Sequence, residues 1–161
     1  MCLECGCSES NEVKIDGKPM LHGSSNHHHS HSHNGKGEVR EISIKQDILQ
    51  KNNQIAQHNR DYLQSKNIFC TNWISAPGSG KTTLLEKIIA EHGKRFSIFV
   101  IEGDQHTAND ASRIRKAGAQ ALQINTGATC HLDAEMVHQA LHHADLDEAT
   151  FLVIENVGNM V

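Results

Sequence analysis

The chain has 161 residues, which is the usual length of one globular domain. Its net charge of −4, with histidine counted as neutral, gives no electrostatic basis for binding nucleic acid or an anionic membrane surface. No apolar run approaches the ~20 residues that cross a bilayer, and the start of the chain lacks the basic and apolar regions of a signal peptide. The five cysteines are an odd number, so we expect a cytoplasmic protein whose reduced thiols serve metal or redox chemistry.

Residues 1–40 are rich in Gly, Ser, Asn and His, and we expect them to form a disordered, metal-binding tail. The tail begins with three closely spaced cysteines, Cys2, Cys5 and Cys7. Three thiolates at this spacing can converge on one ion, with the α-amine as a fourth ligand, and they suit Zn²⁺, Cu⁺ or Ni²⁺. The alternative is a tail whose thiols bind nothing.

A histidine tract follows in the same tail. Its imidazoles are expected to bind Ni²⁺ or Zn²⁺ weakly, as a metal store, and they belong to His27, His28, His29, His31 and His33. An expression tag is the alternative, but the tract is internal and is interrupted by Ser30 and Ser32.

The next segment, residues 41–65, has the apolar spacing of a long helix. Two adjacent stripes repeat every seven residues: Ile48, Ile55 and Tyr62 beside Leu49, Ala56 and Leu63. This pattern predicts a helix that packs on the flank of its own domain, with a partner interface as the alternative.

From residue 67 onward, predicted strands and helices alternate. We expect strands at 67–75, 96–104, 119–126 and 151–156, and helices at 80–93, 107–118 and 130–143. This order predicts an α/β fold with a mostly parallel sheet flanked by helices, whose ligands bind at the carboxyl ends of the strands. The domain then covers residues 41–161, and we expect it to be incomplete at its C-terminus because the chain ends soon after a strand.

The sequence SAPGSGKTT lies between a predicted strand and a predicted helix, which is the context of a P-loop. Backbone N–H groups of such a loop and the helix N-terminus hold phosphate oxygens. Lys81 is expected to reach the β- and γ-phosphates, and the Thr82 hydroxyl to bind Mg²⁺. The usual pattern has a glycine in place of Ser75, and an ordinary glycine-rich turn is the alternative. The expected nucleotide-binding residues are Gly78, Ser79, Gly80, Lys81, Thr82 and Thr83.

Two acidic residues end predicted strands, Asp104 and Glu155. A carboxylate at this edge can bind Mg²⁺, directly or through water, or orient the attacking water. We expect Asp104 to join Thr82 at the Mg²⁺, and Lys81, Asp104 and Glu155 to be the catalytic residues. The alternative is a pair of acids that cap nearby helices.

A Cys-His pair, Cys130 and His131, is predicted at the start of the helix over 130–143. A helix N-terminus stabilises a thiolate, which favours metal binding. Two ligands do not close a site, so others must come from elsewhere or from a second copy of the chain. The alternative is an ordinary helix start. We expect His138 and His142, one turn apart, to form a solvated polar face.

Together these motifs resemble the HypB family of GTPases. The resemblance is carried by the N-terminal cysteines and histidines and by SAPGSGKTT, EGDQHTANDASRI, INTGATCHLDAEMVHQAL and IENVGN. It implies a P-loop GTPase that helps to insert nickel into the large subunit of nickel–iron hydrogenase. It also implies a homodimer that forms with GTP, with Zn²⁺ or Ni²⁺ at the interface bound by Cys130, His131 and a cysteine beyond Val161.

The implied partners are a HypA-type nickel chaperone, the hydrogenase large-subunit precursor and a SlyD-type prolyl isomerase. The guanine-reading Asn-Lys-x-Asp motif of the family is not in this chain, so guanine specificity rests on the resemblance and we expect impaired hydrolysis. The alternatives are a urease-type nickel GTPase, and a nickel or zinc storage module whose nucleotide site is idle. The intact pair of Lys81 and Thr82 argues against the second alternative.

Overall fold

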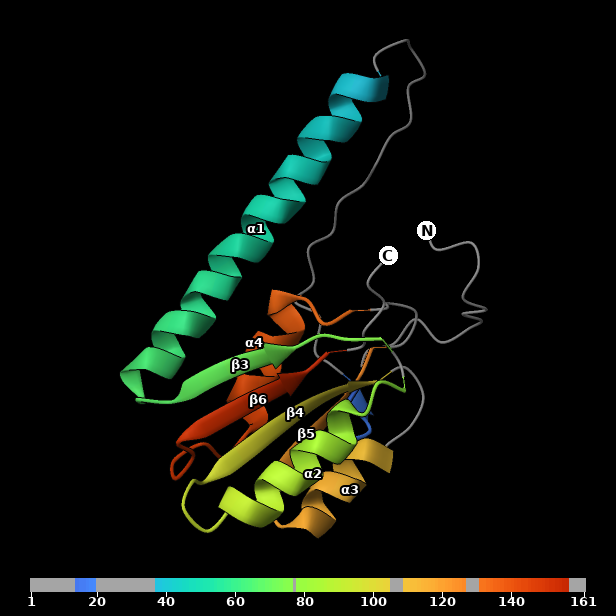
Figure 1. Cartoon of the computed structure of the whole chain (residues 1–161). Helices are drawn as coiled ribbons and strands as arrows, with labels where there is room; N and C mark the ends of the chain where they lie inside the picture. Colours follow the sequence, from blue (N-terminus) through green and yellow to red (C-terminus); the bar gives the residue numbers. More distant parts are fainter. Residues whose placement is uncertain (1–13, 20–36, 77, 105–108, 127–130, 157–161) are drawn as a thin grey trace.

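The computed structural model describes residues 14–19, 37–76, 78–104, 109–126 and 131–156 (Figure 1). Its helices are α1 (Gly37–Ser65), α2 (Lys81–His92), α3 (Asn109–Ala117) and α4 (Ala134–His143). Its strands are β1 (Lys14–Ile15), β2 (Lys18–Pro19), β3 (Phe69–Trp73), β4 (Ile98–Asp104), β5 (Gln120–Asn125) and β6 (Phe151–Glu155).

The strands form one sheet in the order β2-β1-β5-β4-β6-β3. The pairs β3–β6, β4–β6 and β4–β5 are parallel, and within the described part of the chain the antiparallel pairs are β1–β2 and β1–β5. The predicted α/β class with a mostly parallel sheet is therefore confirmed. Because four strands are parallel, their carboxyl ends meet at one edge, where the predicted phosphate loop and both predicted acids lie.

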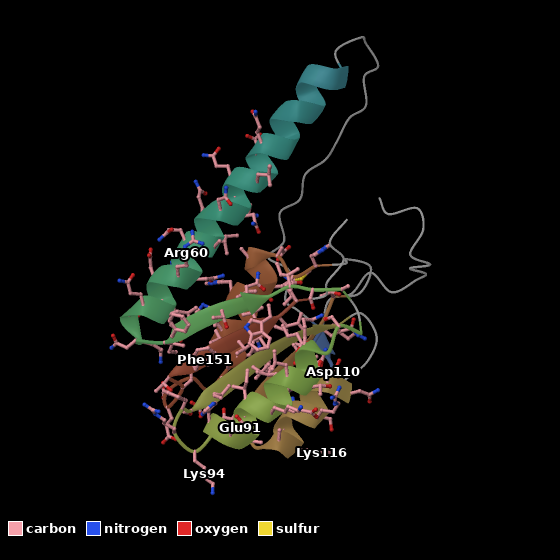
Figure 2. The ribbon with its side chains drawn as sticks, viewed as in Figure 1. Arg60, Glu91, Lys94, Asp110, Lys116 and Phe151 are labelled. Carbon is pink, nitrogen blue, oxygen red and sulfur yellow. The ribbon has the colours of Figure 1, made fainter. Side chains whose placement is uncertain are left out.

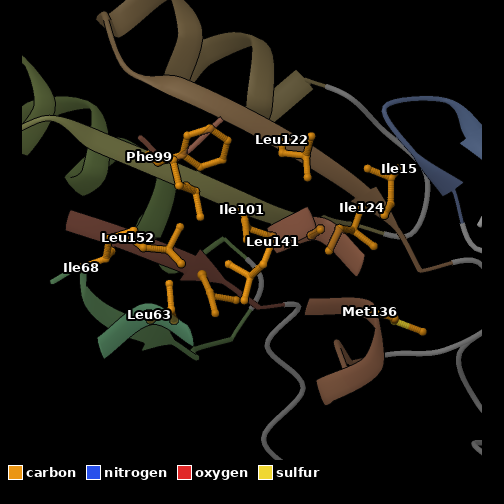
Figure 3. Packing of buried hydrophobic residues seen from close by; sticks show 13 residues of the cluster. Ile15, Leu63, Ile68, Phe99, Ile101, Leu122, Ile124, Met136, Leu141 and Leu152 are labelled. Carbon is orange, nitrogen blue, oxygen red and sulfur yellow. The ribbon is translucent and has the colours of Figure 1, made fainter. Parts of the chain in front are cut away.

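Helices cover both faces of the sheet. In Figure 1, α1 and α4 lie against one face, and α2 and α3 lie against the other. Side chains of β4 alternate between the two: Phe99 and Ile101 enter the core under α1 and α4, whereas Ile98 and Val100 enter the core under α2 and α3. Figure 3 shows the first of these cores. Burial on both faces explains the apolar runs over residues 98–101 of β4 and 151–154 of β6.

The helix α1 has 29 residues, and Figure 1 shows its N-terminal part extending beyond the sheet. Its C-terminal part packs on α4, with Leu63 buried in the core. The predicted packing of this helix on the flank of its own domain is thus confirmed for the C-terminal part. Among the described residues, no helix combines the length and the apolar character needed to cross a membrane.

A short hairpin made by β1 and β2 extends the sheet beyond β5. Its turn residues, Asp16 and Gly17, have φ of +44° and +78°, the conformation of a two-residue hairpin turn. The Asp16 carboxylate accepts hydrogen bonds from the backbone N–H of Gln123 at 3.0 Å and from Arg115 at 3.1 Å, and Ile15 is buried in the core. We predicted a disordered tail over residues 1–40, but residues 14–19 form this hairpin and belong to the sheet.

The last helix begins later than predicted. Its first residue is Ala134, and Asp133 is the N-cap, whose side chain accepts a hydrogen bond from the backbone N–H of Met136 at 2.8 Å. The prediction that Cys130 stands at the helix start is therefore wrong, because an aspartate caps the helix three residues later. Its residues Met136, Ala140 and Leu141 face inward and are buried.

Candidate functional site

The phosphate loop connects β3 to α2, as predicted. Gly78 and Gly80 have φ of +74° and +91°, in the left-handed region, and Gly80 is the N-cap of α2. A Cβ added at either position would meet no atom within 4 Å. The backbone conformation, and not a lack of space, therefore requires glycine here. The loop leads directly into the first turn of α2, whose N–H groups have no partner within the helix.

The side chains of this loop are tied to one another. The Lys81 amine donates to the carbonyl oxygen of Ser75 at 3.1 Å, and the hydroxyls of Ser75 and Ser79 share a hydrogen bond. Ser75 occupies the position where the usual pattern has glycine. Its side chain connects the beginning of the loop to its tip, so this departure from the pattern fits a closed loop.

The predicted Mg²⁺ ligand Thr82 lies beside one of the predicted acids. Its hydroxyl donates to Glu155 Oε1 at 2.9 Å, and both residues are buried. The other carboxylate oxygen, Glu155 Oε2, is buried and has no hydrogen-bond partner among the described residues. A buried carboxylate oxygen without a donor is costly and is the type of ligand that Mg²⁺ prefers. The donor set therefore fits a Mg²⁺ ion held by Thr82 and Glu155.

Asp104 is the last residue of β4, at the same edge of the sheet. Backbone pairing aligns Glu102 with Glu155 and Asp104 with Asn125, so Asp104 lies two positions beyond the level of Glu155. The structure thus places the backbone of both predicted acids at the carboxyl ends of adjacent strands. The position of the Asp104 side chain lies outside what the structure describes.

Sequence reasoning did not identify Arg113 of α3. Its guanidinium donates to Glu86 at 2.7 Å, to Asp110 at 3.2 Å and to the Thr83 hydroxyl at 3.1 Å. The exposed Thr83, predicted to bind nucleotide, is therefore engaged from α3. Through Thr83, which follows Lys81 and Thr82, this group of charges adjoins the phosphate loop; its member Asp110 is labelled in Figure 2. An arginine within a predicted helix gave no signal, because two of its three partners, Glu86 and Thr83, come from another helix.

Most predicted metal ligands lie outside the described residues: Cys2, Cys5, Cys7, His27, His28, His29, His31, His33 and Cys130. His131 is described and exposed. Among the described residues, no three or more His, Cys, Asp or Glu side chains converge as a metal site. The three metal sites therefore stay predictions.

Three asparagines fix the segment that follows the Cys-His pair. Asn156 Oδ1 accepts from the backbone N–H of Leu132 at 3.0 Å, and Asn52 Oδ1 accepts from that of Ala134 at 2.9 Å. Asn59 Nδ2 donates to the carbonyl oxygen of Ala134, also at 2.9 Å. The sequence indicates an inward position for two of the three. Asn52 and Asn59 are seven residues apart, in register with the apolar stripe of α1.

The prediction that His138 belongs to a solvated face is wrong. It belongs to α4 and is half-buried against α1. Its Nδ1 lies 2.8 Å from Asn59 Oδ1, and its ring contacts those of His58 and His142 edge-on. Burial lowers the pKa of His138, and the neighbouring His142 and His58 lower it further, against an opposite effect of Glu135. His142 itself is exposed, as predicted.

Cys70 of β3 is the one cysteine within the described residues. It is half-buried against the core under α1 and α4. Burial raises the pKa of its thiol to about 11. Since the thiolate is the form that binds metal, Cys70 is a packing residue.

Comparison with known proteins agrees with this geometry. Residues 70–161 match the model of the CobW/HypB/UreG nucleotide-binding domain. The chain belongs to the CobW/HypB/UreG family. The matched residues begin in β3 and include the phosphate loop, both predicted acids and the Cys-His pair.

Relatives within this family are HypB proteins, so the predicted resemblance is confirmed. The hydrogenase maturation factor HypB of Rhizobium leguminosarum bv. viciae is 50% identical over 127 residues, which cover 79% of this chain and 42% of the relative. That of Azotobacter vinelandii is 42% identical, covering 100% of this chain and 63% of the relative. The chain therefore spans 42% to 63% of the length of these two relatives.

A solved structure shows the same fold. HypB from Helicobacter pylori in complex with nickel aligns with a TM-score of 0.63 at 42% identity, covering 68% of this chain and 52% of that one. HypB from Archaeoglobus fulgidus aligns with a TM-score of 0.62 at 37% identity. The predicted P-loop fold is thereby confirmed.

Proposed function

We propose that the chain binds GTP and Mg²⁺ at the phosphate loop and hydrolyses GTP as part of nickel insertion during hydrogenase maturation. The observation that carries this proposal is the buried pair of Thr82 and Glu155 beside that loop. A hydroxyl and a carboxylate with a spare buried oxygen match what Mg²⁺ needs at a P-loop. The relatives named hydrogenase maturation factor HypB supply the biological process.

Each residue has a distinct part in this reaction. The N–H groups of the loop and of the first turn of α2 bind phosphate oxygens. Lys81 exchanges its bond to the Ser75 carbonyl oxygen for one to a phosphate, where its charge stabilises the transition state. Thr82 and Asp104 would hold Mg²⁺, which would supply positive charge to the β- and γ-phosphates. Glu155 accepts from Thr82 and directs its second oxygen to the ion or to the attacking water.

The metal sites extend this proposal. Cys2, Cys5 and Cys7 bind Ni²⁺ in the tail, and the histidine tract stores it. Cys130 and His131 bind Zn²⁺ or Ni²⁺ at the interface of a GTP-dependent homodimer. A HypB structure that contains nickel supports a nickel-related role. The further partners are a HypA-type nickel chaperone, the hydrogenase large-subunit precursor and a SlyD-type prolyl isomerase, all in the cytoplasm.

Nickel insertion into urease is the second candidate. One relative, from Helicobacter pylori, is named hydrogenase/urease maturation factor HypB and is 41% identical over 126 residues. A chain that serves urease restores urease activity when produced in cells that lack their own nickel GTPases. A storage module with an idle nucleotide site is disfavoured by the contact between Thr82 and Glu155.

The central test is hydrolysis of GTP with and without Mg²⁺, in the protein extended to the length of its relatives. Lys81→Ala is expected to lower kcat by about 10²–10³-fold, because one charge-stabilising donor is lost. Lys87→Ala, an exposed residue of the same helix, is the control and is expected to keep the full rate. Hydrolysis at the original rate in Lys81→Ala would refute the assignment of the phosphate loop.

The tail is tested separately. Titration with Ni²⁺ is expected to give thiolate-to-nickel absorption that disappears when Cys2, Cys5 and Cys7 are all replaced by Ala. An unchanged spectrum would move the nickel site elsewhere in the protein.

A further inference from the structure

Three imidazoles gather where α4 packs on α1, on the face of the sheet opposite α2 (Figure 1). His138 and His142 lie one turn apart on α4, and their ring centroids are 4.5 Å apart. His58 of α1 contacts His138 from the other helix, with ring centroids 5.3 Å apart. Neither the proposed nucleotide site nor the predicted metal sites use any of these three residues.

The amide of Asn59 determines which nitrogen of His138 carries the proton. Asn59 is buried, and its Nδ2 donates to the carbonyl oxygen of Ala134 at 2.9 Å. The amide oxygen, Oδ1, is therefore the atom that lies 2.8 Å from His138 Nδ1. Because an amide oxygen can only accept, Nδ1 is the donor, and Nε2 of the neutral ring has the unprotonated lone pair. Histidines that bind metal are typically oriented in this way, through the nitrogen that does not touch the ion.

The surroundings of His138 favour the form of the ring that binds metal, which is the neutral one. Burial lowers the pKa of His138, and the neighbouring His142 and His58 lower it further, against an opposite effect of Glu135. His142 is exposed, so its ring can turn toward an ion without disturbing the core. One imidazole is thus held in place, and the second is adaptable.

We propose that His138 and His142 bind a divalent transition-metal ion, such as Zn²⁺ or Ni²⁺, on the flank of α4. Two histidines one turn apart on a helix project from the same face and can bind one ion. Imidazole nitrogen suits both metals. Within the part of the chain that the structure describes, no third His, Cys, Asp or Glu converges with this pair, so water fills the remaining positions around the ion.

The ion would also tie α4 more firmly to α1. It withdraws charge from the ring of His138, which makes Nδ1–H a stronger donor to Asn59 of α1. The site lies apart from the phosphate loop, and the inference does not depend on nucleotide binding.

Because the full chain carries other predicted metal ligands, the experiment must resolve single rings. Long-range ¹H–¹⁵N NMR correlations of the histidine rings do so, with signals assigned through His138→Gln and His142→Gln. In the metal-free protein, we expect His138 to be protonated at Nδ1. Zn²⁺ is then added beyond the amount that the tail binds. We expect Nε2 of His138 and one ring nitrogen of His142 to shift together, along one saturation curve.

His143→Gln is the matched control for His142→Gln. His143 is the next residue and is also exposed, but its Nδ1 lies 2.8 Å from the carbonyl oxygen of Gln139, and it is not one turn from His138. In His142→Gln, the His138 signal is expected to need at least about tenfold more Zn²⁺, because a second ligand on the same helix is lost. In His143→Gln, the saturation curve is expected to stay unchanged.

Several results would overturn the proposal. A proton on Nε2 of His138 in the metal-free protein would contradict the orientation by Asn59. A His138 signal that ignores Zn²⁺, or that responds equally well in His142→Gln, would show that the pair binds no ion. An equal loss in His142→Gln and His143→Gln would show that the effect is not specific to residues one turn apart.

Discussion

The hydroxyl of Thr82 lies 2.9 Å from Oε1 of Glu155, although 73 positions separate the two residues in the chain. The contact joins the first turn of α2 to the end of β6, and both side chains are buried. It therefore connects the phosphate loop to β6. The residue after β6, Asn156, accepts from the backbone N–H of Leu132, next to the predicted metal ligand His131. Several measurable properties depend on this arrangement and on its neighbours.

Glu155→Gln separates the charge of this residue from its hydrogen bond. The glutamine carbonyl can still accept from Thr82, so we expect the free energy of unfolding to change by less than about 1 kcal/mol. The loss of charge is expected to weaken binding of Mg²⁺·GTP at least tenfold while metal-free GTP binds as before. Titrations with and without Mg²⁺ measure this difference. If Mg²⁺·GTP affinity is unaltered, Glu155 is no part of the cation site.

Gly80→Ala tests the backbone of the phosphate loop. At a φ of +91° a residue with a Cβ costs about 1–2 kcal/mol, although the space is open. We expect the loop to relax and nucleotide affinity to fall about tenfold. Gly118→Ala is the control, because φ is +107° there but the residue lies after α3. Both variants are expected to lose similar stability in urea titrations, and a loss of affinity in both would argue against a local effect.

Gly103→Ala tests the contact between β4 and Leu132. The added Cβ would lie 2.7 Å from the leucine side chain, and such overpacking costs typically 1–3 kcal/mol. The φ of Gly103 is not among the positive values, so the cost is steric. A smaller residue, Leu132→Ala, removes the clash, and we expect the double variant to be more stable than the sum of the single effects predicts. Additive free energies of unfolding would show that the two residues do not press on each other.

His138 is expected to make stability depend on pH. Its pKa is lowered in the folded protein and returns to about 6.5 on unfolding. As pH falls through about 6.5, the unfolded chain therefore takes up a proton that the folded protein does not. The free energy of unfolding is highest above this pH and decreases toward the lower, folded pKa.

The check compares urea denaturation at pH 7.5 and 5.5 for the wild type, for His138→Gln and for His143→Gln. The first variant is expected to lose less stability on acidification than the wild type, because its neutral side chain takes up no proton. The second changes an exposed histidine of the same helix and is expected to follow the wild type. A His138→Gln variant as acid-sensitive as the wild type would count against this histidine.

Local patterns were sufficient to predict the parallel sheet and the phosphate loop. Short continuous apolar runs mark β4 and β6, and the glycines at 78 and 80 mark a turn that needs positive φ. The hairpin at Asp16-Gly17 carried a readable signal too, since an Asp-Gly pair favours a two-residue turn. It was overlooked because the segment around it is polar.

Contacts between distant segments could not be read from the sequence. That Asn156 would accept from Leu132 and Asn52 from Ala134 depends on how α1 and β6 pack against the start of α4. The helix start was predicted too early, at Cys130-His131. Asp133, three residues after Cys130, has a strong N-cap preference and is the N-cap in the structure.

The hairpin also limits where the tail can go. Lys14 is paired with Asn125, the last residue of β5, five positions before Cys130. Cys7 lies seven residues before Lys14, and a fully extended chain of this length spans at most about 25 Å. A tether this short keeps two reactive groups at an effective concentration on the order of millimolar, whatever the concentration of the protein. For the proposed metal sites, this limit predicts that transfer between the N-terminal thiols and the Cys-His pair occurs within one molecule and does not vary with protein concentration.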